Sequence, residues 1–573
     1  MASLTAKKIG GRTYYYLREC QRVDGRPKIV WQKYLGTAAE VAAALEKHPS
    51  ALEPLPEAAV FEFGAVTAVY DLSRRLELVK TIDHRVPKRA NGGPSVGTYL
   101  MLAALNRAVA PRSKRKLAGW YKQTSLPRYL KIRPSQLTSQ RFWDNMDRVS
   151  EAALIDIERE LTERVVQRYE VDRSSLFYDA TNFFTFIDSF NVRPSLAQRG
   201  KSKEGRANLR ILGLALLVTR DHHIPLFHHL YPGNQPDAPT FRSVLGELVA
   251  RYRLFAQGVE DITLVFDKGN NAEDIIESVD KSPYHFVGSL VPTQHEDLLA
   301  IAWSKYRQLD PELFPDGVYA HRTEKEVYGR RFPVLMTYNE NLFVAQTRTL
   351  DREIAKRQGK LRAYQQSLER WRRGKGRGKR PTVKSAEKGV ARILQGRHMK
   401  DLFRVEIQAE SRGKTKGLPK LRYRFDGAAY RRLQRTLLGK TILFTDQEEW
   451  SDEQMVLAYR GQHFVEGAFR QMKDVRYLSF RPSFHWTDQK LRVHAFCCVA
   501  ALLLCSLLRL ELLRKGIKLT IPSMLHRLGS IQEVHVLTSS GRGRPRTHRV
   551  RSKLDSLAQR LFDAVGLDRY LKA

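Results

Sequence analysis

Acidic residues are scarce in this chain of 573 residues, which holds 61 Asp and Glu against 98 Lys and Arg. The resulting formal net charge of +37 lies far from the near-neutral balance of most soluble enzymes. An excess of this size indicates a polyanionic partner, and nucleic acid is the first candidate because Lys and Arg neutralise its phosphates. Global disorder is excluded, since 42% of the residues are hydrophobic and 10% are aromatic.

Cysteine is also rare in this sequence. The chain has four, Cys20, Cys497, Cys498 and Cys505, and they form no C-x-x-C pair. This excludes a disulfide scaffold, argues against a zinc site and favours a reducing compartment.

Long hydrophobic runs and nucleotide-binding loops are missing as well. The most apolar window, 495–508, is shorter than the roughly 20 residues that a membrane-spanning helix needs, so it predicts a buried core helix and no membrane partner. Residues 1–10 lack the apolar segment of a secretory signal, and we expect none. No Gly-x4-Gly-Lys-Ser/Thr loop occurs, so we expect no nucleotide cofactor.

The order of apolar patterns predicts a mixed α/β fold. Residues 9–36 alternate like short strands, and 61–169 carry helical spacing. Farther along, two tight connections followed by helical crossovers predict a mixed sheet, antiparallel first and parallel later. Its expected strands are 175–178, 209–219, 224–231, 262–266 and 284–290.

The most basic stretch lies at 351–400, which holds 17 Lys and Arg against 4 Asp and Glu, a net charge of +13. It combines a charged helix at 350–371 with a basic loop at 371–380. Such a stretch is either a solvated face or a set of phosphate contacts. The candidate DNA-binding residues of the loop are Arg372, Arg373, Lys375, Arg377, Lys379 and Arg380.

Two aspartates stand where predicted apolar strands end. Asp179 follows Leu176-Phe177-Tyr178, and Asp267 follows Leu264-Val265-Phe266. A carboxylate in this position points into the crevice beyond the edge of the sheet, although each alone is also typical of a turn or a helix N-cap.

A third acid, Glu466, lies on a helix that the pattern predicts over 452–474. At about 100° per residue, Tyr459, Arg470 and Lys473 fall on the same face as Glu466, and Gln462 lies about 40° from it. The same stripe is also compatible with an exposed amphipathic helix. Three converging carboxylates are ligands for Mg²⁺ or Mn²⁺, and two such ions can clamp the attacking and leaving oxygens of phosphoryl transfer.

Five segments in this order resemble bacterial insertion-sequence transposases of the DDE class. The resemblance is closest to the IS-four-like superfamily, whose third acid lies in a Tyr-x2-Arg-x3-Glu-x6-Lys signature. Tyr459, Glu466 and Lys473 match that signature, whereas Gln462 stands at the position of its Arg, and Arg470 or Arg460 could compensate for the lost charge. The segments are YDATNFF from 178, LAQRGKSKEGRANLR from 196, PGNQPDAPT from 232, VFDKGNNAED from 265, and YRGQHFVEGAFRQMK from 459.

The resemblance implies a ribonuclease-H-like core with a mixed five-stranded sheet and a catalytic, metal-binding triad of Asp179, Asp267 and Glu466. It implies two divalent ions, Mg²⁺ or Mn²⁺, and a DNA transposase that binds terminal inverted repeats, cleaves the strands and joins 3′-hydroxyl ends to target DNA. The expected partners are double-stranded DNA and a second copy of the chain in the DNA complex. The expected location is the bacterial cytoplasm, in association with the nucleoid.

The chain is expected to divide into six regions. These are a β-rich DNA-binding module at 1–50, a helical DNA-binding or dimerisation region at 57–170, the first part of the core at 171–290, a β-rich insertion with a basic helical hairpin at 291–445, the last part of the core at 446–515, and a basic C-terminal region at 516–573.

Several other readings remain open. The chain could be a catalytically silent DNA-binding derivative, or a metal-dependent nuclease of the same fold. A cluster of four histidines, His222, His223, His228 and His229, could bind metal, although no Cys or acid at zinc-site spacing supports it. The GRGRPR segment from 541 resembles an AT-hook core, which makes Arg542, Arg544 and Arg546 further DNA-binding candidates, or else it is a solvated linker.

Overall fold

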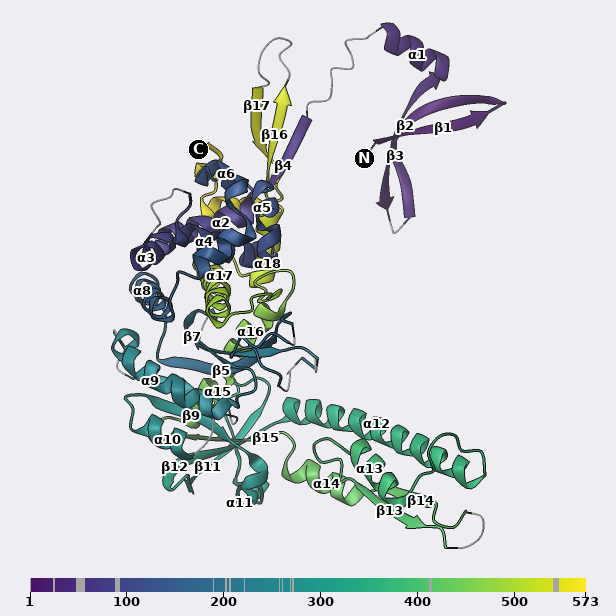
Figure 1. Cartoon of the computed structure of the whole chain (residues 1–573), viewed down its shortest axis with the longest axis vertical. Helices are drawn as coiled ribbons and strands as arrows, with labels where there is room; N and C mark the ends of the chain where they lie inside the picture. Colours follow the sequence, from purple (N-terminus) through teal and green to yellow (C-terminus); the bar gives the residue numbers. More distant parts are fainter. Residues whose placement is uncertain are drawn as a thin grey trace.

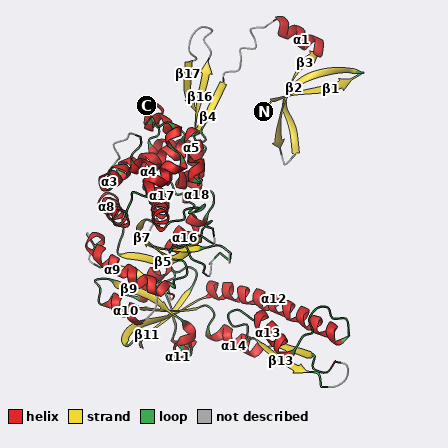
Figure 2. Ribbon diagram, in the orientation of Figure 1, coloured by secondary structure: helices red, strands yellow, loops and turns green. Residues whose placement is uncertain are grey.

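The chain forms a mixed α/β structure in which a helical region lies above a large sheet and a long arm extends from it (Figure 1). The computed structural model describes residues 2–23, 26–47, 57–87, 93–188, 190–200, 204–205, 208–220, 222–256, 258–259, 261–267, 269, 273–411, 415–538 and 546–572. Figure 2 shows one group of helices above the main sheet and further helices beside the sheet and in the arm.

The main sheet is built around the predicted strands. Its first half is a set of three antiparallel strands followed by two strands parallel to the first, which confirms the predicted mixed order. The strands are β5 (Ser175–Phe184), β6 (Ile211–Thr219), β7 (Pro225–Pro232), β8 (Thr263–Val265) and β9 (His285–Leu290).

The main sheet has more strands than the five that were predicted. Among the described residues nine strands pair in the order β10-β11-β12-β15-β9-β8-β5-β6-β7. The difference arises because strands from the predicted insertion extend the sheet: β15 pairs antiparallel with β9, and β12 pairs with β15. The added strands are β10 (Arg307–Gln308), β11 (Val318–Val327), β12 (Arg330–Asn339) and β15 (Lys440–Thr445).

Helices cover both faces of the sheet at β5. Successive side chains of a strand point to opposite faces. Phe177 contacts Phe464 of α16 (Gln462–Lys473) at a ring-centroid distance of 5.8 Å, whereas Tyr178 contacts Phe241 of α9 (Asp237–Phe255) at 4.5 Å. One face therefore belongs to α16, and the other belongs to α9. The helix α10 (Glu273–Asp280) contacts α9 and β9, and α15 (Asp452–Arg460) contacts α16, β9 and β15.

The helices predicted from the apolar spacing of residues 61–169 are present, and helices from the C-terminal part of the chain pack with them. The central helix is α17 (Asp488–Arg514), which contains the predicted buried helix. Its length and apolar composition would suffice for a membrane span, but 83% of its most apolar window is buried inside the protein, as in a core helix. Around it lie α2 (Gly64–Arg75), α3 (Leu78–Arg85), α4 (Val96–Val109), α5 (Lys114–Lys122), α6 (Leu126–Leu130), α7 (Ser139–Met146), α8 (Glu151–Tyr169) and α18 (Ile521–Gly529).

Segments far apart in sequence meet in this region. The strand β4 (Glu57–Glu62) pairs with β16 (Gln532–Thr538), which also pairs with β17 (Arg546–Arg551). The chain then ends in α19 (Ser556–Val565) and α20 (Asp568–Lys572). The sequence patterns had not predicted β4, because its partner lies more than 450 residues away.

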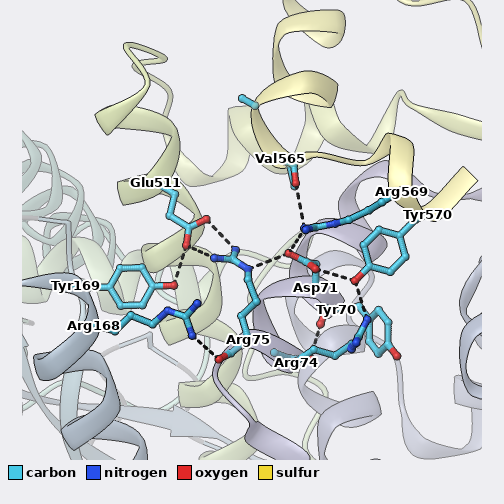
Figure 3. A network of polar contacts seen from close by, with 12 residues as sticks. Tyr70, Asp71, Arg74, Arg75, Arg168, Tyr169, Glu511, Val565, Arg569 and Tyr570 are labelled. Carbon is cyan, nitrogen blue, oxygen red and sulfur yellow. Dashed lines mark hydrogen bonds and ion pairs between the residues drawn. The ribbon is translucent and has the colours of Figure 1, made fainter.

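A polar network joins α2 to α17 and to the C-terminal helix α20 (Figure 3). Asp71 of α2 accepts a hydrogen bond from the Tyr570 hydroxyl at 2.7 Å and pairs with Arg75 and Arg569. Arg75 also forms a two-pronged ion pair with Glu511 of α17, at 2.6 and 2.8 Å. Each carboxylate in this network is matched by a guanidinium, which makes burial of its charge tolerable.

The arm has a small hydrophobic core of its own. Its longest element is α12 (Glu340–Arg372), which extends the predicted charged helix of 350–371 by ten residues at its N-terminal end. Asn339 caps this helix by accepting a hydrogen bond from the backbone N–H of Leu342 at 2.8 Å. Leu361 and Leu368 of α12 pack with Val390 and Leu421. The other elements are α13 (Val383–Ile393), β13 (Phe403–Ala409), β14 (Pro419–Phe425) and α14 (Gly427–Thr436).

The N-terminal residues form a separate antiparallel sheet. It consists of β1 (Ala2–Ile9), β2 (Arg12–Val23) and β3 (Arg26–Thr37), followed by α1 (Ala38–Lys47). The alternation predicted two of these strands, and the predicted Asp24-Gly25 turn lies outside the described residues.

Candidate active site

The register of the sheet aligns the first two candidate acids. Phe177 of β5 pairs with Val265 of β8, and Val265 pairs with Val287 of β9. Side chains repeat their direction every second residue. Two residues farther along, Asp179, Asp267 and Ser289 therefore form the next row on the same face, and the hydrogen bond from Phe266 N to Val287 O extends the pairing beyond β8.

This row faces α16, the helix that carries Glu466. Asp179 shares its face with Phe177, which contacts α16, and with Thr181, whose hydroxyl accepts a hydrogen bond from Lys473 Nζ at 2.8 Å. Two residues of the predicted signature helix thus reach the strand of the first acid. Gln462 is the second, because its Nε2 donates to the carbonyl oxygen of Tyr178 at 3.2 Å.

The signature does not lie on one continuous helix, in contrast to the prediction. The predicted helix of 452–474 is divided at Gly461 into α15 and α16. A Cβ on Gly461 would lie 2.2 Å from the Phe177 ring, so only glycine allows this close approach of the chain to β5. The consequence is that Tyr459 reaches the sheet from α15, while Glu466 and Lys473 approach from α16.

Tyr459 connects the row of the sheet with the third acid. Its hydroxyl donates to Ser289 Oγ at 2.8 Å and lies 3.4 Å from Asp267 Oδ1. Burial raises the pKa of Tyr459, and the negative charges of Asp267 and Glu466 raise it further. Both carboxylates therefore act on the same hydroxyl, which stays protonated and available as a hydrogen-bond donor.

The three acids differ in exposure. Asp179 and Asp267 are half-buried, and Asp179 Oδ1 accepts a hydrogen bond from the backbone N–H of Ala180 at 2.7 Å. Glu466 and Arg470 are exposed on α16, one helical turn apart. The two strand carboxylates are therefore partly shielded within the sheet, whereas the Glu466 carboxylate on α16 is open to the solvent.

The donor set has the chemistry of a site for hard divalent cations, because it consists of carboxylate and hydroxyl oxygens. Within the part of the chain that the structure describes, however, no group of three or more His, Cys, Asp or Glu side chains is arranged to hold a metal ion. Shared metal binding by Asp179, Asp267 and Glu466 stays a prediction, and it requires the carboxylates to close around the ion.

Ser289 and Thr181 are site residues that the sequence analysis missed. Ser289 follows Gly288 in an apolar strand, and Thr181 follows Asp179 by two residues. The signal for Thr181 was present, because i and i+2 share a face of a strand. The position of Ser289 depends on the pairing of β8 with β9, which the sequence does not reveal.

The candidate DNA-binding residues of the basic loop lie at the tip of the arm, far along the chain from the acids. Arg372 is half-buried and paired with Glu410, and Arg380 donates to the backbone carbonyl of Lys416 at 3.0 Å. The other four, Arg373, Lys375, Arg377 and Lys379, are exposed. Arg542 and Arg544 lie outside the described residues, as does the side chain of Arg546.

The predicted histidine cluster is divided between two different environments. His223 Nδ1 donates a hydrogen bond to the carbonyl oxygen of Phe464 at 2.6 Å and thereby contacts α16. His228 pairs with the buried Glu158, which also binds Arg251 at 2.8 Å. The cluster thus takes part in packing contacts between the sheet and two helices.

Comparisons with known proteins give weak likenesses. A scan against protein-family models and a search of curated proteins found no match. Among solved structures, a piggyBac transposase synaptic complex with hairpin DNA aligns with a TM-score of 0.36 and 8% identity over 83% of this chain and 82% of that chain. A Mos1 transposase paired-end complex with the left transposon end gives 0.14 and 12% over 34% and 59%, and a Mos1 mariner paired-end complex with Mn gives 0.13 and 12% over 44% and 72%. TM-scores this low do not establish a shared fold.

Proposed function

We propose that the protein is a DNA transposase of the DDE class. In this proposal it binds the terminal inverted repeats of a mobile element, cleaves the DNA strands and joins the 3′-hydroxyl ends to target DNA. The observation that carries the proposal is the placement of the signature residues: Asp179 and Asp267 align in one row of the sheet, and Glu466 approaches that row from α16.

The sheet topology supports a ribonuclease-H-like core. The strands β7, β6 and β5 are antiparallel neighbours, and β8 and β9 follow on the other side of β5 in parallel. This order of three antiparallel strands and two parallel ones is the order that the apolar patterns predict, and a mixed sheet is what the family resemblance implies. The additional strands β10, β11, β12 and β15 extend the same sheet beyond β9.

The composition supports DNA as the substrate. A net charge of +37 provides sequence-independent affinity for phosphates, and the exposed cations of the arm extend this charge away from the site. The six predicted regions, the homodimer in the DNA complex and the location near the nucleoid belong to the same proposal.

The residues divide the chemistry between them. Asp179, Asp267 and Glu466 are the proposed ligands of two Mg²⁺ or Mn²⁺ ions, which when bound would activate a water or 3′-hydroxyl nucleophile and stabilise the leaving oxygen. Tyr459 orients Asp267 through its hydroxyl, and Ser289 holds that hydroxyl in place. Lys473 fixes the end of α16 to β5 through Thr181, which holds the helix that carries Glu466 against the strand that carries Asp179.

The test is a cleavage and joining assay on DNA that carries the element ends, which are the matched inverted repeats expected beside the gene. We expect Mg²⁺-dependent strand cleavage and products in which the 3′-ends are covalently joined to a target plasmid. Cleavage without joined products would instead assign a nuclease of the same fold. Specific DNA binding without cleavage would assign a silent DNA-binding derivative.

A further inference from the structure

Three aromatic side chains are exposed beside the end of β5. Phe186 is 44% exposed, Phe484 is 52% exposed and Trp486 is 38% exposed. We call these three residues the aromatic platform. Exposure of large rings in one place marks a surface that is covered when the protein binds its partner.

The backbone segments that carry the platform are held together by a hydrogen bond and by buried neighbouring side chains. In the segment from 483 to 486, Ser483 and His485 are buried, whereas Phe484 and Trp486 are exposed, which is the alternation of an extended chain. The backbone N–H of Phe186 donates to the carbonyl of Ser483 at 2.9 Å, and the Phe186 and Phe484 rings lie 5.3 Å apart. The rings are therefore held at the surface by buried neighbours.

Cations surround these rings. The Arg193 guanidinium lies 4.8 Å from the Trp486 ring centre, and Lys490 Nζ lies 5.9 Å from it. Arg481 stacks over Phe184 at 4.5 Å. Behind the platform, Arg107 and Lys114 are buried, and both act electrostatically on His485.

The acids in this neighbourhood are already engaged. Glu204 pairs with Arg481 at 3.3 Å, and Asp147 pairs with Lys490. Asp488 accepts hydrogen bonds from the backbone N–H groups of Ser195 and Leu196, and Asp188 accepts one from Phe190 N. The surface therefore combines exposed π faces with the exposed guanidinium of Arg193, which is the chemistry of a site for single-stranded nucleic acid.

The platform is mechanically linked to the candidate active site. Phe184, the last residue of β5, is five residues from Asp179, or roughly 17 Å along an extended strand. Arg481 donates to the carbonyl of Lys473 at 2.6 Å, and Lys473 in turn binds Thr181 of β5. The distance corresponds to about five steps of a B-form strand, which is within reach of a DNA strand held at the acids.

We propose that the aromatic platform stacks unpaired bases of the DNA strand that is held at the candidate active site. This inference rests on the proposed function, because it takes DNA as the substrate. Phe484 and Trp486 provide the stacking faces, and the exposed guanidinium of Arg193 beside Trp486 neutralises an adjacent phosphate. The site selects strands with unpaired bases and shows no preference among the bases, because every base has a π face.

The test compares the full-length protein with the variant Phe484→Ala/Trp486→Ala. The probe is a fluorescein-labelled oligothymidylate of about 16 nucleotides, and fluorescence anisotropy gives its dissociation constant. We expect the double variant to bind this probe about 10- to 100-fold more weakly, whereas its affinity for blunt duplex DNA changes by less than about 3-fold. A probe of the same length with abasic sites in place of thymidines should bind the wild type and the variant equally.

Two control variants separate stacking from other effects. Phe484→Tyr/Trp486→Phe keeps both rings and should bind the oligothymidylate within about 3-fold of the wild type. Val475→Ala removes another exposed apolar side chain near the end of α16 and should leave binding unchanged. Circular dichroism and thermal unfolding of each variant establish that it is folded.

The proposal is overturned if the double variant binds oligothymidylate as tightly as the folded wild type. It is also overturned if the variant loses self-association instead, because the platform would then be an interface between copies of the chain. Failure of the proposed function is a different result: the wild type would not cleave duplex DNA with Mg²⁺, while the platform variants would still lose affinity for unpaired bases.

Discussion

Two groups of acids in this protein have opposite surroundings. In the network of Figure 3, Asp71 pairs with Arg75 and Arg569, and Glu511 pairs with Arg75. At the candidate active site, Asp267 meets the Tyr459 hydroxyl and aligns with Asp179, a second carboxylate. The first arrangement sets each carboxylate against a guanidinium, whereas the second aligns two carboxylates in one row of the sheet.

The pKa values of two tyrosines, Tyr169 in the network and Tyr459 at the candidate site, reflect this difference between the two groups of acids. Burial and Glu511 raise the pKa of Tyr169, but Arg75 and Arg168 oppose this effect. Burial, Asp267 and Glu466 raise the pKa of Tyr459, and only a hydrogen bond with Ser289 opposes them among the effects in the described structure. Acids matched by arginine hold helices together, whereas a tyrosine whose pKa is raised by two nearby acids is typical of a functional site.

The largest expected effect comes from removing a charge at the site. Asp179→Asn, Asp267→Asn and Glu466→Gln should each reduce DNA cleavage by about 10³-fold or more, because each variant loses a carboxylate ligand of the proposed metal ions. The midpoint of thermal unfolding and the affinity for duplex DNA should change little. A variant that cuts at nearly the wild-type rate would remove its residue from the proposed triad.

A substitution in the network of Figure 3 should instead affect stability and leave cleavage unchanged. Asp71→Asn should lower the free energy of unfolding by about 2 kcal/mol, since two guanidinium partners and the Tyr570 hydroxyl lose a charged acceptor. The cleavage rate per folded molecule should stay at the wild-type value. Urea unfolding followed by circular dichroism measures the first quantity, and a strong loss of cleavage in folded protein would contradict the division between the two groups.

The comparison explains what the sequence could predict. Apolar runs identified β5, β6 and α17, and the spacing of Glu466 from Lys473 placed them on one helix face. These features depend on neighbouring residues, so local patterns carry them.

Other features depend on contacts between distant segments. The row of Asp179, Asp267 and Ser289 follows from the pairing of three strands, and β15 joins β9 across about 150 residues of sequence. The break at Gly461 follows from the Phe177 ring, which lies nearly 300 residues earlier. Nothing in the sequence near Gly461 distinguishes it from a glycine that a helix tolerates.

A third prediction concerns the exposed cations of the arm. Substitution of Arg373, Lys375, Arg377 and Lys379 by Gln should reduce the slope of log affinity for DNA against log salt by up to about four units, one for each lost phosphate contact. Arg372→Gln is the matched control, because its guanidinium is paired with Glu410 and should contribute little to the slope. An unchanged slope in the quadruple variant would make the loop a solvated surface only.

A fourth prediction concerns Lys114, which is a buried cation near Arg107. Burial, assisted by Arg107, lowers the pKa of Lys114 from 10.5 to about 8. The charged form is therefore penalised in the folded state, and this penalty is fully present below about pH 8 and disappears as the pH rises toward 10.5. Lys114→Met should raise the free energy of unfolding at pH 7 by about 2 kcal/mol, and the gain should shrink between pH 8 and 10. A variant less stable than the wild type at pH 7 would contradict this account.

The smallest effects are expected at the position that departs from the family signature. Gln462 contacts the carbonyl of Tyr178 beside Asp179, and its Oε1 is buried with no hydrogen-bond partner among the described residues. Gln462→Arg should maintain or raise cleavage, by up to about 10-fold, because a guanidinium there would attract the scissile phosphate. Arg470→Ala should lower cleavage several-fold if Arg470 supplies the missing charge. Equal rates for Arg470→Ala and wild type would show that it does not.

The central claim is that Asp179, Asp267 and Glu466 form one metal-binding site, and calorimetric titration with Mn²⁺ tests it most directly. We predict that the wild type and Asp71→Asn bind Mn²⁺ alike, whereas Asp179→Asn, Asp267→Asn and Glu466→Gln each lose binding of at least one ion. If any of these three folded variants bound Mn²⁺ with the stoichiometry and affinity of the wild type, the three carboxylates would not share a site, and the account would be wrong.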